Sequence, residues 1–195
     1  MTESTTTNDP AEFDVEAWLT DAKMPEESAE VYKRADVIAE LQVVRRQIET
    51  QREAATIEKT AHGDTVLRNL ERRYKDLVET FTGSKLTIYV RAISPDEQRE
   101  SREATEKRTD GMDPKLQNME FGYDLLARSI VAVRPAEGER TPVSWSVKQV
   151  KAMEKSIGAA QMSEVLNARM QAQNGLPRVD ADFLPKPSGS EDGQG

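Results

Sequence analysis

Apolar residues in the first half of the chain recur three and four positions apart, which is the spacing of amphipathic helices. The two runs are Val31, Ala35, Ile38, Leu41, Val44 and Ile48, then Val66, Leu67, Leu70, Tyr74, Leu77 and Phe81. Pro25, followed by two acids, is typical of a helix start, and Gly83 is typical of a helix end. The pattern predicts an antiparallel helical hairpin over residues 25–83, with its turn at the AHGDT segment, 61–65.

After Gly83 the apolar period changes to two. Apolar side chains from Leu86 to Ala92 alternate with polar ones, which predicts a half-buried strand. The run Ile130–Val133 is the other segment that we interpret as a strand. We expect these two to pair in a small two-stranded sheet, which helices must cover because such a sheet is marginal alone.

Helix-start signals divide the remainder of the chain. Ser94 with Glu97 forms a capping-box pattern, Pro114 begins a second helix, and Ser146 with Gln149 forms a second capping-box pattern that begins a third helix. The helix after Ser94 has almost no apolar face, so we expect it to be exposed or to cover a partner through its side-chain stems. A last helix is predicted at 159–173. The predicted fold class is mainly α with a small two-stranded sheet, α+β.

The predicted organisation has five parts. They are a disordered acidic arm at 1–12, a short helix at 13–24, the helical hairpin at 25–83, a compact, helix-rich α+β domain at 84–175, and a disordered tail at 176–195. The net charge of −8 is carried by the first 30 residues, which hold nine acids and one lysine. We expect this arm to act through charge, as a solubility element.

Composition excludes several classes of protein. With 195 residues, 36% hydrophobic and 32% charged, the chain can bury one modest core. It has no cysteine and no long apolar run, and its first residues do not resemble a signal peptide, so we expect an intracellular protein without membrane contact. Its basic pairs lie among acids in helical patterns, which disfavours nucleic-acid binding.

No catalytic motif is found in the sequence. His62 is the single histidine and has no nucleophile beside it, and there is no phosphate loop, dinucleotide turn or metal-ligand spacing. We therefore expect no enzymatic activity, no cofactor and no metal.

Several segments, read in order, resemble the tail assembly chaperones of long-tailed bacteriophages, particularly those of actinobacterial phages. They are FDVEAWLTDAKMPEESAEVYKRADVIAELQ, a charged hairpin ending in Phe81, LTIYVRAISPDEQRES, FGYDLLARSIVAVRP, a loop with Trp145, and EVLNARMQAQNGLPRVDADFLPKPSGS. The resemblance covers most of the chain. One departure is the helix after ISPDE, which lacks the tryptophan or leucine anchor of similar proteins, so we assign no client contact to it.

The resemblance implies a protein of the host cytoplasm that is absent from the mature virion. Its partner would be the tape-measure protein, around which it would help tail-tube subunits polymerise, with contact to the tail-tube protein and self-association also open. In that family a longer product is often made by ribosomal frameshifting.

Four residues are candidates for client binding. Phe183 and Leu184 form an apolar pair in the predicted tail, while Met162 and Met170 have flexible side chains suited to varied clients. Ordinary core filling is the alternative for the methionines, and capping of the protein's own core is the alternative for the apolar pair.

A rival function is a virion structural protein or a coiled-coil adaptor that assembles through the hairpin. The apolar stripe thins after Ile48, which favours a hairpin within one chain over a long coiled coil.

Overall fold

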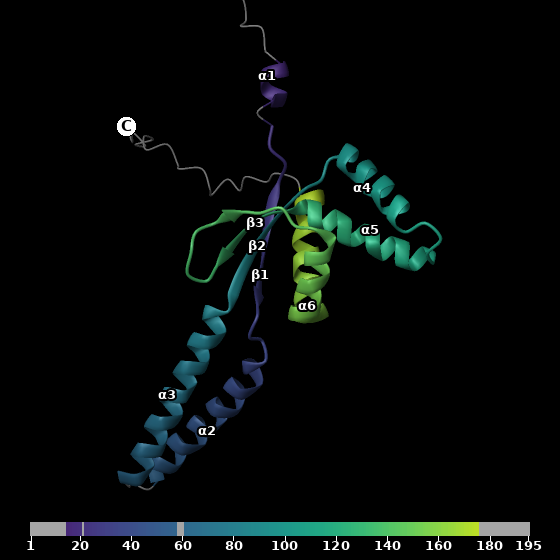
Figure 1. Cartoon of the computed structure of the whole chain (residues 1–195). Helices are drawn as coiled ribbons and strands as arrows, with labels where there is room; N and C mark the ends of the chain where they lie inside the picture. Colours follow the sequence, from purple (N-terminus) through teal and green to yellow (C-terminus); the bar gives the residue numbers. More distant parts are fainter. Residues whose placement is uncertain (1–14, 21, 58–60, 176–195) are drawn as a thin grey trace, which may run out of the picture.

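The computed structural model describes residues 15–20, 22–57 and 61–175, and it confirms the α+β class. The elements are α1 Val15–Thr20, β1 Glu26–Tyr32, α2 Val37–Ile57, α3 Ala61–Gly83, β2 Lys85–Arg91, α4 Pro95–Arg108, α5 Pro114–Ser129, β3 Ile130–Pro135, β4 Thr141–Pro142 and α6 Val147–Asn174. Figure 1 shows α2 and α3 projecting together from a body formed by the sheet and helices α4, α5 and α6. The predicted arm 1–12 and the tail 176–195 lie outside the described residues.

A four-stranded antiparallel sheet in the order β1-β2-β3-β4 forms the centre of the body. The predicted pairing of β2 with β3 is confirmed, with Ile88 opposite Val133. The expected two-stranded sheet is wrong in size, because β1 pairs with the other edge of β2 and the two-residue β4 pairs with β3. The additional strands give the sheet the width that a stable half-buried sheet needs.

The segment that begins the predicted hairpin is a strand, not a helix. In β1, Ala29 and Val31 are buried and lie opposite Ile88 and Leu86 of β2, while Glu30 between them is exposed. Pro25 and the two acids after it suit a helix start, but pairing with β2 overrides that local preference. The hairpin helices therefore begin at residue 37 rather than at residue 25.

The far end of the hairpin also differs from the expectation. The predicted turn at 61–65 lies at the start of α3, which begins at Ala61. The first backbone N–H groups of a helix have no intrahelical acceptor, so a glycine is tolerated at this position. The connection at 58–60 lies outside the described residues. The predicted helix end at Gly83 is confirmed. Near it, the rings of Phe81 and Tyr32 stack with centroids 4.2 Å apart and join the hairpin to β1.

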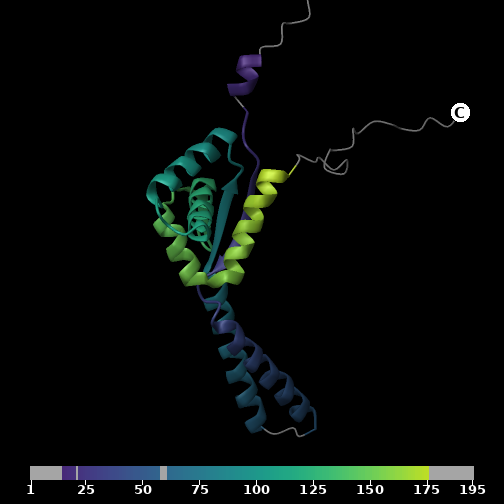
Figure 2. The same cartoon turned by 90° about the vertical axis from the view of Figure 1, so that its right-hand side faces the viewer.

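The main core lies between one face of the sheet and helices α5 and α6. Its buried members are Ala29, Val31, Ile88, Val90, Leu126, Ala127, Ile130, Val150, Met153, Met162, Val165 and Ala168. Figure 2 shows α6 bent into two arms. The bend is at Gly158, with φ of 79° and ψ of 166°, so the two predicted C-terminal helices are the arms of one bent element.

Helix α4 packs against α5 through small polar side chains. Ser101 and Thr105 of α4 are buried, and Arg102 lies over the ring of Phe121. Covering a neighbour is one of the two alternatives expected for this helix, and α4 does cover α5, but its buried side chains are small hydroxyl-bearing ones rather than long stems. Ser101 donates to the Asp124 carboxylate of α5 at 2.7 Å. The predicted capping boxes at Ser94 and Ser146 are both confirmed.

Candidate functional site: an open groove on the helical hairpin

The apolar residues of the hairpin form a seam along the contact between α2 and α3. Val37, Val44 and Ile48 of α2 are buried. The facing apolar residues of α3 are all half-buried: Val66, Leu67, Leu70, Tyr74, Leu77, Val78 and Phe81. Because α2 and α3 pack mainly on each other, no third helix of the described part of the chain covers the flanks of this seam. A pair of helices by itself leaves such flanks open to solvent.

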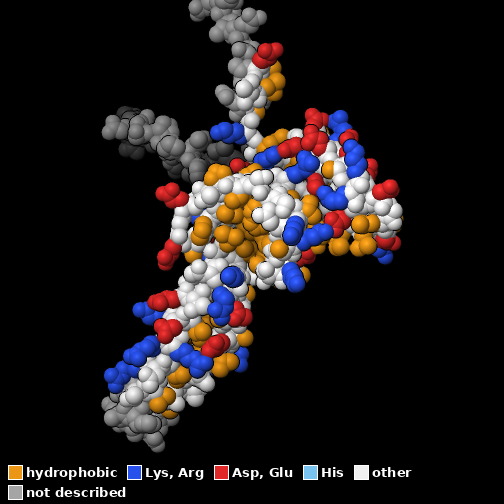
Figure 3. Space-filling view, in the orientation of Figure 1, with side chains coloured by type: hydrophobic (Ala, Val, Ile, Leu, Met, Phe, Trp, Pro, Cys, Tyr) orange, Lys and Arg blue, Asp and Glu red, His pale blue; other side chains and the backbone are white. Residues whose placement is uncertain are grey.

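One flank is a groove, which we call the hairpin groove. It is lined by Val43, Arg46, Gln47, Thr50 and Gln51 of α2 with Val66 and Leu70 of α3. Val43 is 51% exposed, although it lies next to the buried seam. Figure 3 shows hydrophobic side chains between rows of charged ones along the hairpin. The groove therefore has an apolar floor and a polar rim on α2.

The opposite flank is crossed by an ion pair. Arg52 of α2 donates to Glu71 of α3 at 2.7 Å, beside Ile48 and Tyr74. On the side of the hairpin groove, the ion pair between Arg73 and Glu40 joins the two helices. Arg46 on the rim of the hairpin groove makes no ion pair or side-chain hydrogen bond to another described residue. The hairpin groove thus combines uncovered apolar surface with an unused positive charge.

The structure does not bring the four predicted client-binding residues together. Met162 is 3% exposed and belongs to the core, so core filling is its role there. Met170 is 53% exposed and lines a separate groove beside β1 and the end of α6. Phe183 and Leu184 lie outside the described residues.

The hairpin groove was not identified from the sequence. Val43 falls one position from the seam residue Val44, and it does not belong to the apolar run from which the hairpin is predicted. An apolar residue flanking a narrow helical stripe was the available signal, because such a residue widens the stripe beyond what a single partner helix covers.

Other apolar surface is distributed over the body. Met112, Leu116 and Met119 are each 48% exposed at the start of α5. Figure 3 also shows a broad hydrophobic area over the body, near the loop between β3 and β4. In the body, half-buried residues such as Trp145 and Val133 pack against the core cluster, so they complete the core.

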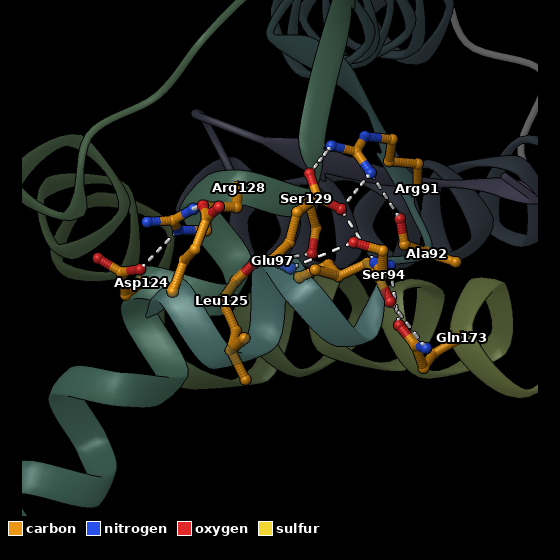
Figure 4. A network of polar contacts seen from close by, with 11 residues as sticks. Arg91, Ala92, Ser94, Glu97, Asp124, Leu125, Arg128, Ser129 and Gln173 are labelled. Atoms are coloured by element: carbon orange, nitrogen blue, oxygen red, sulfur yellow. Dashed lines mark hydrogen bonds and ion pairs between the residues drawn. The ribbon is translucent and has the colours of Figure 1, made fainter. Parts of the chain in front are cut away.

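The Glu97 carboxylate near the start of α4 is held by several donors (Figure 4). Glu97 accepts from both terminal nitrogens of Arg91, with Nη1 at 3.0 Å, and from the Ser94 backbone N–H at 2.9 Å. The Arg91 hydrogen bond is the main reason that the pKa of Glu97 falls from 4.5 to about 2, against the opposing effect of burial. Gln173 of α6 bonds to both the backbone N–H and carbonyl of Ile93. These contacts fix the passage from β2 into α4.

Asp124 is the buried carboxylate of the α4–α5 interface. Besides Ser101, it accepts from Arg128 Nε at 2.9 Å and from Arg108 Nη1 at 3.4 Å. Burial raises the pKa of Asp124, but the hydrogen bonds from Ser101 and Arg128 outweigh that effect and hold the pKa below its ordinary value. A carboxylate occupied by three donors is suited to holding two helices together rather than to accepting a proton from a substrate.

Within the described ranges, no group of three or more histidine and acidic side chains could hold a metal ion. None of the helices described there is long and apolar enough to cross a bilayer. The chain matches no protein-family model, no curated protein and no solved structure. A binding role for the hairpin groove therefore rests on its geometry and on the sequence.

Proposed function

We propose that this protein is a non-enzymatic tail assembly chaperone of a long-tailed bacteriophage, and that it holds helical segments of the tape-measure protein in the hairpin groove. The observation that carries the proposal is the uncovered apolar floor of that groove. The order of sequence segments described above supports the phage assignment. In this proposal the protein acts in the host cytoplasm and leaves before the virion matures.

The shape of the groove favours a helix as the bound element. A client helix lying along α2 and α3 would complete a three-helix bundle and cover Val43, Val66 and Leu70. Fully burying an exposed aliphatic side chain contributes about 1.5–3 kcal/mol. These three side chains are already about half-buried, so each would contribute about half of that, whereas association costs at least about 4 kcal/mol in lost freedom. The groove by itself therefore supports weak binding, which suits a partner that must be released.

The charges of the groove indicate which face of a client helix would fit. Arg46 stands on the rim without an ion-pair partner among the described residues. A client helix with an acidic residue beside its apolar stripe would pair with it. Such rim pairs contribute to register and association rate more than to affinity.

The test is co-expression with the tape-measure protein encoded by the same phage. The proposal predicts that the tape-measure protein is soluble with this protein and aggregates without it, and that a complex is recovered on co-purification. Equal solubility in both cases, with no complex recovered, would overturn the proposal.

Virion composition separates the proposal from its structural rival. A chaperone should be absent from purified virions, whereas a virion component or adaptor should be present in stoichiometric amounts. Quantitative mass spectrometry of purified particles measures this directly.

A further inference from the structure

The outer edge of β1 carries backbone groups that the sheet does not use. β1 is an end strand and pairs only with β2. The Lys33 N–H donates to the Ser84 carbonyl at 3.2 Å just after β1, which places the odd-numbered residues of β1 in the hydrogen-bonded pairs of this antiparallel ladder. The even-numbered residues of β1 therefore point their N–H and C=O groups away from β2.

Glu26, Ser28 and Glu30 are the exposed residues with outward backbone groups. No strand or side chain in the described part of the molecule bonds to those groups. At Tyr32 the side-chain amide of Gln161 takes the place of a neighbouring strand, accepting from the backbone N–H at 2.6 Å and donating to the carbonyl at 3.1 Å. The edge is therefore closed at Tyr32 and open from Glu26 to Glu30.

A groove lies beside β1 and the end of α6. Its lining includes Glu27, Glu164, Met170 and Asn174. Neither Glu27 nor Glu164 forms an ion pair with another described residue. The groove thus offers two unused negative charges and the exposed thioether of Met170 next to the backbone groups of the edge.

We propose that β1 accepts an extended segment of another protein as an added strand, and that this segment alternates lysine or arginine with apolar residues. Strand addition draws affinity from main-chain hydrogen bonds and specificity from alternate side chains. Because alternate side chains of a strand point to opposite faces, its basic side chains would lie on the groove face, beside Glu27 and Glu164, with their methylene stems over Met170. Its apolar side chains would lie on the other face, beside Ser28. This site is separate from the hairpin groove and does not depend on the function proposed for that groove.

Charge disfavours a second copy of this chain at this edge. It would bring the Glu27 side chains of two β1 edges toward each other, and Glu27 has no ion-pair partner among the described residues, whereas Glu26 and Glu30 are paired with Arg140 and Lys85. Opposite charge therefore selects a basic segment from another protein.

The probe is a labelled ten-residue peptide that alternates lysine and valine, with a peptide that alternates glutamate and valine as the matched control. Binding to the full chain is measured by fluorescence anisotropy, and the site is located by NMR shifts of the Ser28 and Glu30 amides. We expect the lysine peptide to bind, to shift these amides and to be weakened by salt. The glutamate peptide should not bind.

The variant Ser28→Pro removes one outward donor and leaves the bonds to β2 in place, because proline is tolerated on an edge strand when its nitrogen faces outward. It should weaken the lysine peptide about tenfold, whereas Ser28→Thr should not. If Ser28→Pro does not fold, a lysine peptide N-methylated at alternate residues makes the same test and should also bind about tenfold more weakly.

Several results would overturn the proposal. They are unchanged binding in the proline and N-methyl tests, shifts that map away from β1, or no binding at all. Binding that appears only after removal of residues 176–195 would assign the edge to the protein's own C-terminal segment. A dimer that dissociates in Ser28→Pro would assign the edge to a second copy.

Discussion

At the scale of single residues, Glu97 links the start of α4 to β2, and its contribution to stability should depend on pH. Its folded-state pKa of about 2 lies below the ordinary 4.5, so its contribution is complete above about pH 4.5 and is lost as pH falls toward 2. Glu97→Gln should lower the free energy of unfolding by about 1–2 kcal/mol at neutral pH, because a charge-assisted bond to the partly buried Arg91 is lost. Urea denaturation over this pH range measures the difference.

Glu103→Gln is the matched control for Glu97→Gln. Glu103 lies on the same helix, is exposed, and forms no ion pair with another described residue, so its substitution should change stability little at any pH. A difference between Glu97→Gln and wild type that stays constant from neutral pH to about pH 2 would contradict the role assigned to the Arg91–Glu97 pair.

The local part of this arrangement was predictable, and the distant part was not. The spacing of Ser94 and Glu97 predicts the capping box, because both partners lie within one helical turn. The further bond from Arg91 to Glu97 and the bond from Ser101 to Asp124 depend on how the chain returns on itself. The exposure of Val43 likewise depends on tertiary structure, because α2 packs mainly on α3 and no other described helix covers this side of it.

At the scale of elements, the bend of α6 depends on Gly158. Its φ of 79° and ψ of 166° lie in a region that is essentially restricted to glycine. A Cβ added there would meet nothing within 4 Å, so the cost of substitution is in the backbone rather than in packing. Gly158→Ala should therefore lower the free energy of unfolding by about 1–3 kcal/mol. Chemical denaturation of the wild-type protein and of Gly158→Ala measures this difference.

Gly122→Ala provides the comparison. Gly122 is in α5, and a Cβ there would also meet nothing within 4 Å. Because its backbone does not require glycine, alanine should stabilise the helix by about 0.5–1 kcal/mol. If both substitutions had the same sign and size, the bend would not depend on the conformation of Gly158.

Elements with strong local signals were predicted, and the element with a mixed signal was not. The strand at Leu86 and the break near Gly158 follow from alternation and from a glycine between two apolar runs. β1 was missed because Pro25 and two acids are typical of a helix start, and its buried residues, Ala29 and Val31, make a very short alternation. Pairing with β2 decides the outcome, and sequence periodicity carries no information about it.

At the scale of the whole molecule, the described part of the chain forms a packed body and a projecting hairpin. The body holds the sheet, the core and the polar network of α4, whereas the hairpin leaves its apolar flank uncovered. A change on the hairpin groove should therefore alter partner binding without unfolding the body. Val43 and Ile38 allow a matched comparison, because both are exposed on α2, at 51% and 41%, and only Val43 lines the groove.

The most direct test measures how much tape-measure protein is recovered with affinity-tagged wild type, Val43→Glu and Ile38→Glu after co-expression. Val43→Glu puts a charge on the apolar floor of the groove and should reduce the recovered tape-measure protein about tenfold or more. Ile38→Glu should recover as much as wild type, and both variants should keep the wild-type circular dichroism spectrum. Full recovery with Val43→Glu, or equal loss with both variants, would contradict the assignment of the hairpin groove as the client-binding site.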